Sequence, residues 1–581
     1  MPIEKRWVVK PQGDPATVAM LAAALRISPV LANLLVQRGI DNVEKAEKFF
    51  KPSLADLHDP FLMKDMDRAV ERVERAVANN EKIMVYGDYD VDGCTAVALV
   101  YKFLRQIGHK NLMFYIPDRY TEGYGISIKG IDLAARKGVG LIIALDCGIK
   151  ATEKIVYAKT KGVDFIICDH HLPAEEIPKA VAVLDPKRVD CSYPFDELSG
   201  CGVGFKLVQA YAQKNAFEQI VPLLDLLVVS IASDIVPLVG ENRILAYFGL
   251  KYLNREPSKG LLSIIKICGL DKHSITIDDI VFKIGPRINA AGRMRMDEND
   301  ENASPSGGHA AVELLIEGNE SIAEEFGSVI DAYNQDRKSI DRSVTQEAHD
   351  FIERNPAMKA LKSTVIYNPR WMKGIVGIVA SRLIETYYRP TVVLTMSNGY
   401  VTGSARSVPG FDLYQAVESC SDLLENFGGH MYAAGLTMRP ENVGEFTRRF
   451  NAFVEENIDP QMLVPQVDID SELLFSDITP AFRKDLNRFQ PFGPGNTAPV
   501  FATYGVSNHG DAKLVGMECE HLRMDLMQRQ KPNTKIQAIA FQQPTHYEWV
   551  RSGRPIDVCY QIVENHYRGT VTTQLRVKDI K

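Results

Sequence analysis

Short apolar runs alternate with amphipathic segments between residues 83 and 169. The runs IMVYG, LMFYIP, LIIALD and DFIICD are each followed or preceded by a segment with helical periodicity, such as TAVALVYKFLRQIG. Continuous apolar runs of this length, separated by helices, are typical of parallel strands that are buried on both faces. The pattern therefore predicts an α/β domain in which helices cover both faces of a parallel sheet.

A second α/β pattern begins near residue 363. The expected strands STVIYN and TVVLT flank the helical segment KGIVGIVASRLIETYY, and the Gly-rich stretches GSARSVPGFDLYQAV and FGGHMYAAGL follow. We expect GSARS to be a Gly-flanked loop. A polar, Gly-, Ser- and Pro-bearing stretch after Met294 is expected to be a loop, and residues 309–354 show a long helical pattern that connects the two α/β segments.

From about residue 461 the pattern changes to short strands and turns, which favours a small β-barrel, with an oligonucleotide-binding fold as the natural candidate. The cations Arg523, Arg529, Lys531 and Lys535 are spread through this region. The expected domain limits are 1–50 for an N-terminal helical extension, 51–294 for the first α/β domain, 295–355 for a loop and connecting helix, 356–455 for the second α/β domain and 461–581 for the barrel.

The composition is that of an ordinary globular protein, with 45% apolar and 24% charged residues in 581. No run approaches the about 18 apolar residues that a membrane helix requires, and the start has no signal-peptide core. Nine cysteines form no CxxC pair, so they are expected to be small buried residues. These features predict a cytoplasmic protein. The net charge of −7 does not exclude a polyanionic partner, because local patches bind phosphates.

Acidic and histidine residues follow the expected strands. GDYDVDG, ALDCG and CDHH each begin where a strand ends, and VVSIASDIVPL ends an apolar segment in Ser-Asp. Since ligands bind beyond the carboxyl ends of parallel strands, these residues are expected to lie on one edge of the sheet. The acidic and histidine candidates are Asp88, Asp90, Asp92, Asp146, His170, His171 and Asp234.

Crowded carboxylates repel one another unless a cation lies among them. One imidazole among carboxylates, with no thiolate, suits Mn²⁺ or Mg²⁺. Five ligands suffice for two ions, a pair that activates water and stabilises a phosphoryl group under attack. Arginines at 119, 287, 293 and 406 are candidates to hold phosphate oxygens. The glycine stretch GCGVGFK lacks a Walker Lys-Ser/Thr pair, which favours a helix start over a phosphate loop.

The motifs GDYDVDG, ALDCG, CDHHLP and SDIVPL resemble, in order, those of the DHH phosphoesterase superfamily. DRYTEGYG, SGCGVGFK, GPRINAAGRM, WMKGIVGIVASRL, GSARS and FGGHMYAAG are similar to the bacterial exonuclease branch of that superfamily. This resemblance implies a parallel-sheet DHH domain, a smaller α/β DHH-associated domain joined by a long helix, and a C-terminal oligonucleotide-binding barrel. It also implies a DNA-repair and recombination exonuclease that releases 5′-mononucleotides from the 5′ end of single strands.

Carried over to this chain, the resemblance implies a set of site residues. The metal ligands would be Asp90, Asp92, Asp146, His170 and Asp234, with Asp146 bridging two Mn²⁺ or Mg²⁺ ions. The other catalytic residues would be His171, Asp88, Asn289 and Arg293. The substrate contacts would be Arg119, Tyr124, Arg287, Ser404, Arg406 and His430. His430 taken alone could equally be a core histidine.

Three functional interpretations follow. The first is a metal-dependent exonuclease on single-stranded DNA, with a single-stranded-DNA-binding protein and a helicase as expected partners, no membrane partner and a monomeric state. The second is a catalytically silent DHH scaffold, although a scaffold has no physical need for so many repelling carboxylates. The third is hydrolysis of short oligonucleotides or cyclic dinucleotides, which would gain little from about 120 residues of additional binding surface.

Overall fold

A computed structural model describes residues 4–294, 307–528, 534–567 and 570–581. The chain forms two compact units. One contains Lys51–Ser339 and Pro491–Thr497, and the other contains Met1–Phe50, Ile340–Gln490 and Ala498–Lys581. Residues 295–306 of the acidic loop expected at 295–308 lie outside the described residues, as do Arg529 and Lys531.

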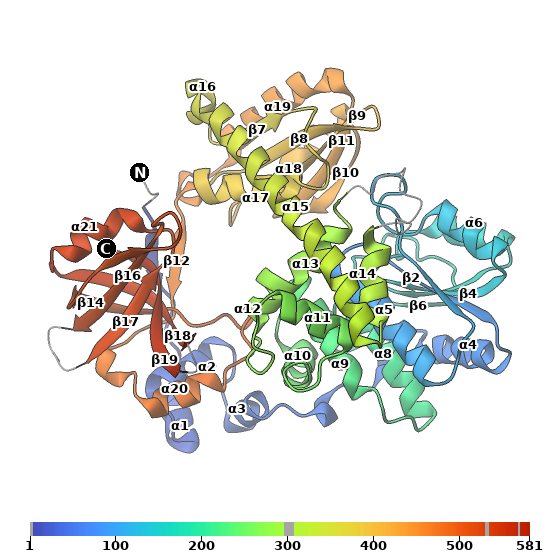
Figure 1. Ribbon diagram of the computed structural model, residues 1–581, viewed down its shortest axis with the longest axis horizontal. Coiled ribbons are helices and arrows are strands. Elements are labelled where there is room, and N and C mark those ends of the chain that lie inside the picture. The colour runs from blue at the N-terminus through green and yellow to red at the C-terminus, as the bar shows by residue number, and fades with distance from the viewer. Residues whose placement is uncertain (1–3, 295–306, 529–533, 568–569) are drawn as a thin grey trace. The chain divides into compact units, whose positions relative to one another are not determined.

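The first unit is built on a five-stranded parallel sheet in the order β3-β2-β4-β5-β6 (Figure 1). Its strands are β2 (Lys82–Gly87), β3 (Leu112–Tyr115), β4 (Val139–Leu145), β5 (Asp164–Cys168) and β6 (Ala182–Leu184). Alternate residues of β2 enter two separate cores, with Ile83 and Val85 in one and Met84 and Tyr86 in the other. The predicted parallel sheet, buried on both faces, is confirmed.

Helices cover the two faces of this sheet. One face packs on α4 (Met66–Ala78), α5 (Val91–Gln106) and α8 (Gly200–Lys214), and the other on α6 (Ile128–Arg136) and α7 (Thr152–Thr160). The apolar segment before Asp234 is a buried helix, α9 (Leu224–Ser233), and Asp234 is its C-cap. The unit continues with α10 (Gly240–Leu253), α11 (Lys259–Ile267), α12 (Ile277–Asp279) and α13 (Gly285–Ala291).

The helical pattern over residues 309–354 is not one helix but two, α14 (Gly307–Ile316) and α15 (Glu320–Glu353). The break lies at Glu317, whose carboxylate accepts hydrogen bonds from the N–H groups of Gly318 and Asn319. The Asn319 side chain then accepts from the N–H of Ser321 and starts a new helix. Side chains that compete for backbone N–H groups therefore interrupt the helix, although the apolar periodicity continues across the break.

A second five-stranded sheet, in the order β10-β11-β9-β8-β7, belongs to the other unit. Its strands are β7 (Thr364–Tyr367), β8 (Thr391–Ser397), β9 (Tyr400–Arg406), β10 (Leu424–His430) and β11 (Ala433–Met438), and helix α17 (Val376–Tyr387) packs on β8 and β9. The expectation that GSARS is a loop is wrong. These residues lie in or next to β9, which pairs with β8 on one side and β11 on the other, so its backbone N–H groups serve the sheet.

The C-terminal strands close into a five-stranded barrel. The strands are β14 (Phe501–Asn508), β16 (His521–Gln528), β17 (Lys535–Ala540), β18 (Ile556–Tyr567) and β19 (Thr570–Ile580). Pairing runs β14-β18-β19-β17-β16, and β16 pairs again with β14 to complete the ring. The predicted barrel is confirmed, and closure leaves no free sheet edge among these five strands.

The N-terminal segment contains α1 (Pro15–Leu25), α2 (Pro29–Gln37) and α3 (Val43–Phe50). It also contributes a strand that the sequence pattern did not predict, β1 (Arg6–Val9), which pairs in parallel with β12 (Gln466–Ile469). In the described part of the chain, no single helix is long and apolar enough to span a bilayer. Only the pair α1 and α2, bent by 119°, reaches that length and composition jointly.

Candidate active site

The GDYDVDG motif forms the turn from β2 into α5. Asp90 is the N-cap of α5, and its carboxylate accepts the N–H of Gly93 at 3.0 Å. A Cβ at position 93 would lie 2.4 Å from the Asp88 carbonyl oxygen, so the turn requires glycine there. The turn thus places Asp88, Asp90 and Asp92 together at the carboxyl end of β2.

Asp92 is held by the start of another helix. The N–H groups of Gly200 and Cys201, at the N-terminus of α8, donate to its two carboxylate oxygens at 2.6 and 2.8 Å. The Ser230 hydroxyl of α9 adds a third hydrogen bond at 2.7 Å. The GCGVGFK stretch is therefore a helix start, as predicted, and its N-terminal dipole stabilises a buried carboxylate. The part played by Ser230 has no signal in the sequence.

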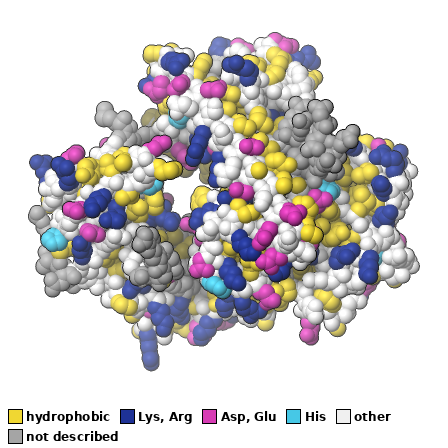
Figure 2. Space-filling view, in the orientation of Figure 1, with side chains coloured by type: hydrophobic (Ala, Val, Ile, Leu, Met, Phe, Trp, Pro, Cys, Tyr) yellow, Lys and Arg dark blue, Asp and Glu magenta, His cyan; other side chains and the backbone are white. Residues whose placement is uncertain are grey.

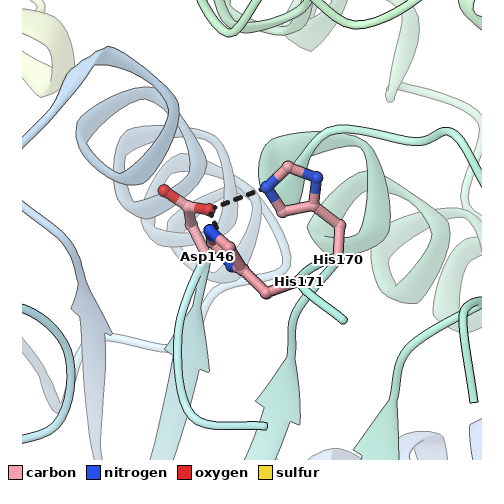
Figure 3. Close-up of side chains that lie close together, drawn as sticks. All are labelled: Asp146, His170 and His171. Atoms are coloured by element: carbon pink, nitrogen blue, oxygen red, sulfur yellow. Dashed lines mark ion pairs between the residues drawn. The ribbon is translucent and has the colours of Figure 1, made fainter. Parts of the chain in front are cut away.

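Asp146 adopts a left-handed backbone conformation with φ of +58° at the end of β4, and Gly200 leaves room for it: a Cβ at 200 would lie 2.6 Å from the Asp146 Cβ. Its carboxylate Oδ1 lies 3.2 Å from His170 Nε2 and 4.0 Å from His171 Nδ1. Figure 3 shows the two imidazoles converging on this carboxylate. A strained backbone at such a point is typical of functional sites.

Two groups of side chains offer atoms close enough to share a metal ion, and His170 belongs to both. Asp146, His170 and His171 form one group, and Asp92, His170 and Asp234 form the other, with ligand atoms within 4.8 Å of one another. His170 Nε2 lies 3.7 Å from both Asp92 Oδ2 and Asp234 Oδ2. The donor set of carboxylates and imidazole fits Mn²⁺ or Mg²⁺.

Unsatisfied buried atoms support the same interpretation. Asp88 Oδ2 is buried without a hydrogen-bond partner among the described residues, and the Gly125 N–H approaches its Oδ1 at the long distance of 3.5 Å. Burial, and then the charge of Asp90, raises the pKa of Asp88 well above its usual value. Buried carboxyl groups left in this state are costly unless a cation compensates them.

Burial and neighbouring charges also raise the pKa values of other carboxyl groups in the cluster. Burial, followed by the charges of Asp92 and Asp90, raises the pKa of Asp146 well above its ordinary value. Burial and the same two carboxylates raise the pKa of Asp234 to about 9. The cluster therefore holds protons that a divalent cation would have to displace.

His171 is oriented by Asp169. Its Nδ1 lies 2.7 Å from Asp169 Oδ1, and its Nε2 lies 3.1 Å from the Tyr124 hydroxyl, which lies 3.0 Å from the Asp146 carbonyl oxygen. Burial opposes ionisation of Asp169, but the hydrogen bond and charge of His171 and the N–H of Ile149 outweigh it and lower its pKa to about 2. The same pairing raises the pKa of His171 against the effect of burial. The first residue of the DHH triplet thus orients the third.

The predicted phosphate-binding arginines do not all lie near the carboxylate cluster. The Arg119 guanidinium lies 4.8 Å from the centre of the Tyr89 ring, next to the carboxylates. Arg293 follows α13, which also carries Asn289, and its charge acts on Asp90. Arg287 instead donates to Asp331 of α15 at 2.8 Å and to the Lys283 carbonyl, so it ties α13 to α15 and the structure does not bring it to the cluster.

The remaining candidates lie on one face of the second sheet. Two rows of paired residues cross the neighbouring strands β9, β11 and β10. One row consists of Arg406, Ala433 and His430. The other consists of Ser404, Gly435 and Gly428. Residues opposite one another in a sheet share a face. The Arg406 Nη1 donates to the Ser404 hydroxyl at 2.8 Å. His430, Gly428 and Gly435 are exposed on this face, whereas Ser404 and Arg406 are half-buried, with Gly377 of α17 beside them.

This parallel sheet, with a carboxylate and histidine cluster at the carboxyl ends of its strands, defines a DHH-type phosphoesterase. The DHH family N-terminal domain matches residues 82–231, the DHHA1 domain matches 359–456, and the RecJ OB domain matches 469–579. The single-stranded-DNA-specific exonuclease RecJ of Bacillus subtilis is 35% identical over 577 residues, covering 99% of this chain and 70% of that protein. The RecJ of Haemophilus influenzae is 31% identical over 570 residues, covering 95% and 96%.

The crystal structure of RecJ from Thermus thermophilus in complex with Mn²⁺ aligns with a TM-score of 0.82 at 25% identity, covering 99% of this chain and 79% of that one. The chain belongs to the RecJ family of single-stranded-DNA-specific exonucleases. The resemblance seen in the sequence motifs is thereby confirmed.

Proposed function

We propose that this protein hydrolyses single-stranded DNA with two divalent cations, Mn²⁺ or Mg²⁺, releasing 5′-mononucleotides from the 5′ end during DNA repair and recombination. The observation that carries the proposal is that His170 Nε2, at the carboxyl edge of the parallel sheet, lies within 3.7 Å of carboxylate oxygens of Asp92, Asp146 and Asp234. Asp90, Asp92, Asp146, His170 and Asp234 would hold the cations, which supply an activated water and neutralise phosphoryl charge. The buried, repelling carboxylates argue against a silent scaffold.

The chain's own residues would orient the scissile phosphate. His171, fixed by Asp169 and facing Tyr124, presents an imidazole of raised pKa and would donate a proton or a hydrogen bond to a phosphate oxygen. Arg119 and Arg293 supply positive charge beside the cluster. Asn289 lies in α13, the helix that ends just before Arg293. Asp88 would support the cluster through its buried carboxyl group.

The 5′ end would be recognised on the second sheet, since a metal cluster alone cannot select a strand polarity. Arg406 makes no ion pair with a carboxylate among the described residues, and burial lowers its pKa. Gly377, in the first turn of α17, borders the pair: a Cβ there would lie 3.1 Å from the Ser404 hydroxyl and 3.2 Å from an Arg406 nitrogen. An uncompensated guanidinium, a hydroxyl and the N-terminus of a helix together suit a terminal phosphate.

DNA would be bound by local basic and polar side chains, not through the net charge of the protein. Figure 2 shows basic and acidic side chains interspersed on the face drawn, in keeping with the net charge of −7. The proposed contact surfaces are the C-terminal barrel and the face of the second sheet that carries Ser404, Arg406 and His430. We retain the domain limits given by the sequence, with the monomer as the working unit.

The setting proposed for the enzyme is the cytoplasm, with a single-stranded-DNA-binding protein and a helicase as partners. All nine cysteines are free, which suits a reducing compartment. A helicase would supply the single strands that the enzyme consumes, and a single-strand-binding protein would present them.

The test of the proposal is digestion of single strands labelled at either end, in the presence of Mn²⁺ or Mg²⁺, with EDTA as the control. Mononucleotides should appear first from the 5′ end of linear strands, whereas circular strands and blunt duplexes should remain intact. Cleavage of the circular strand, or activity that survives EDTA, would contradict a metal-dependent exonuclease.

Metal affinity should rise with pH. Because the pKa of Asp234 is raised to about 9, protons compete with the cation for its carboxylate throughout the neutral range. The Kd for Mg²⁺ should therefore fall by up to about tenfold per pH unit between pH 6 and pH 8. Calorimetric titration in two buffers of different ionisation enthalpy measures both the affinity and the protons released. A Kd that does not change with pH would show that the ligands are already ionised without metal.

The barrel should contribute affinity without catalysis. Arg523 is exposed on β16, directly opposite Lys513 of β15 (Lys513–Val515), so two cations adjoin on its outer surface. Arg523→Glu should weaken binding of long single strands several-fold and reduce the slope of log affinity against log salt by about 0.7 or more. Hydrolysis of a dinucleotide should not change. Arg354→Glu, which alters the same charge outside the barrel, is the matched control for fluorescence-anisotropy titrations, and equal losses in both variants would contradict a specific role.

A further inference from the structure

A short segment from the C-terminal part of the chain belongs to the same compact unit as the active-site cluster. Pro491–Thr497 is a tight turn in which Gly493 and Asn496 exchange backbone hydrogen bonds, both at 3.0 Å. The buried Asn496 side chain donates to the Pro491 carbonyl at 2.8 Å. This segment therefore has a fixed shape of its own, although it connects two elements of the other unit.

The turn packs on the loop that follows Asp234. The Leu238 N–H donates to the Pro494 carbonyl at 2.6 Å. A Cβ on Gly493 would lie 2.6 Å from Leu238 Cδ1, and a Cβ on Gly495 would lie 3.0 Å from a methyl carbon of Val239. Glycine at these two positions lets the backbone of the turn contact the loop directly.

The loop needs outside support to hold its conformation. Ile235, the residue after Asp234, has φ of +61°, a left-handed conformation that is costly for a β-branched residue, and the residue is 62% exposed. Such a conformation persists only where neighbouring structure determines it. Two supports are visible: Asn242 donates to the Pro237 carbonyl at 3.0 Å, and the turn receives the Leu238 N–H. Leu238 is 1% exposed, so the residues that pack on it determine its position.

We infer that Pro491–Thr497 is a positioning segment for Asp234, and through it for the cation that Asp92, His170 and Asp234 would share. The inference rests on the proposed function in that Asp234 is taken as a metal ligand. It assigns to the C-terminal part of the chain a role in the catalytic centre that is separate from DNA binding by the barrel. Removing residues from 461 onward would on this basis damage metal binding as well as DNA binding.

The test uses Gly493→Ala in the full-length chain. Gly493 does not have a positive φ, so the added methyl group acts by pressing on Leu238. The affinity for Mn²⁺ of one of the two sites, the one to which Asp234 contributes, should fall by about tenfold or more, as is typical when a group supporting a metal ligand is lost. Calorimetry and the electron paramagnetic resonance of free Mn²⁺ measure this without DNA. With DNA, kcat at fixed Mn²⁺ should fall while KM changes little.

Two further variants separate positioning from general destabilisation. Gly444→Ala adds a methyl group at a glycine with no atom within 4 Å of the new Cβ, and it should leave Mn²⁺ binding unchanged. Leu238→Ala in the Gly493→Ala background removes the atoms that the methyl group meets, and it should restore much of the lost Mn²⁺ affinity. If wild type binds two Mn²⁺ and digests DNA but Gly493→Ala binds Mn²⁺ as Gly444→Ala does, the positioning role is wrong. If wild type shows neither property, it is the proposed function that fails.

Discussion

Asp146→Asn should reduce the turnover of single-stranded DNA by at least about a thousandfold, because the carboxylate that both imidazoles approach would no longer neutralise cation charge. Asparagine has nearly the same shape and tolerates the left-handed backbone at this position, where φ is +58°. The variant should therefore fold. Rates measured with a short labelled oligonucleotide, and Mn²⁺ stoichiometry measured by calorimetry, test the two consequences together.

The stability of the metal-free protein should change in the opposite direction. Burial and neighbouring carboxylates raise the pKa of Asp146. Above the ordinary pKa of aspartate the folded protein must therefore keep this group protonated while the unfolded chain ionises it, so the metal-free fold loses stability as the pH rises. Removing the charge should raise the melting temperature in EDTA and abolish most of the increase that Mn²⁺ produces in wild type. DNA binding in EDTA should be no weaker. The control is Asp67→Asn, which replaces an exposed carboxylate of α4. Normal turnover in Asp146→Asn would contradict the assignment of Asp146 as the bridging ligand.

The sequence predicted those parts of the fold that depend on local pattern. Buried parallel strands appear in the sequence as continuous apolar runs, and the residues at their carboxyl ends lie at one edge of the sheet. Asp90, Asp146 and His170 could therefore be grouped from the sequence alone. These features need only periodicity and chain direction. The glycine-rich stretch that begins at Gly200 was predicted as a helix start, but only the structure shows that Asp146 packs against this glycine.

Contacts between distant segments could not be predicted in this way. Ser230 bonds Asp92 across 138 positions, and Pro494 bonds Leu238 from beyond the second α/β domain. The pairing of β1 with β12 likewise has no local signal. GSARS is short, polar and flanked by glycine, which favours a loop, whereas pairing on both sides makes it a strand. Local propensity is overridden wherever tertiary pairing satisfies the backbone.

The correction at β9 changes how a terminal phosphate would be held, and therefore what Arg406→Ala should do. With the backbone N–H groups of β9 engaged in the sheet, the contacts left are the Arg406 guanidinium, the Ser404 hydroxyl and the first turn of α17 near Gly377. A charge-assisted hydrogen bond contributes about 1.5–3 kcal/mol. Arg406→Ala should then reduce the preference for a 5′-phosphate over a 5′-hydroxyl by about 10- to 100-fold.

The comparison should use strands labelled at either end that differ only in the 5′ group, so that the ratio of two kcat/KM values cancels any general loss of activity. Ser404→Ala should lower the same ratio by a smaller factor, since it removes a neutral donor and leaves the guanidinium in place. Arg448→Ala, an exposed arginine paired with Glu445 on α19 (Val443–Asn457), should leave the ratio unchanged. Digestion from the 3′ end, or an undiminished ratio in Arg406→Ala, would mean that the terminus is recognised by other residues. A loss confined to the phosphorylated substrate would instead assign strand polarity to the second sheet and the chemistry to the first.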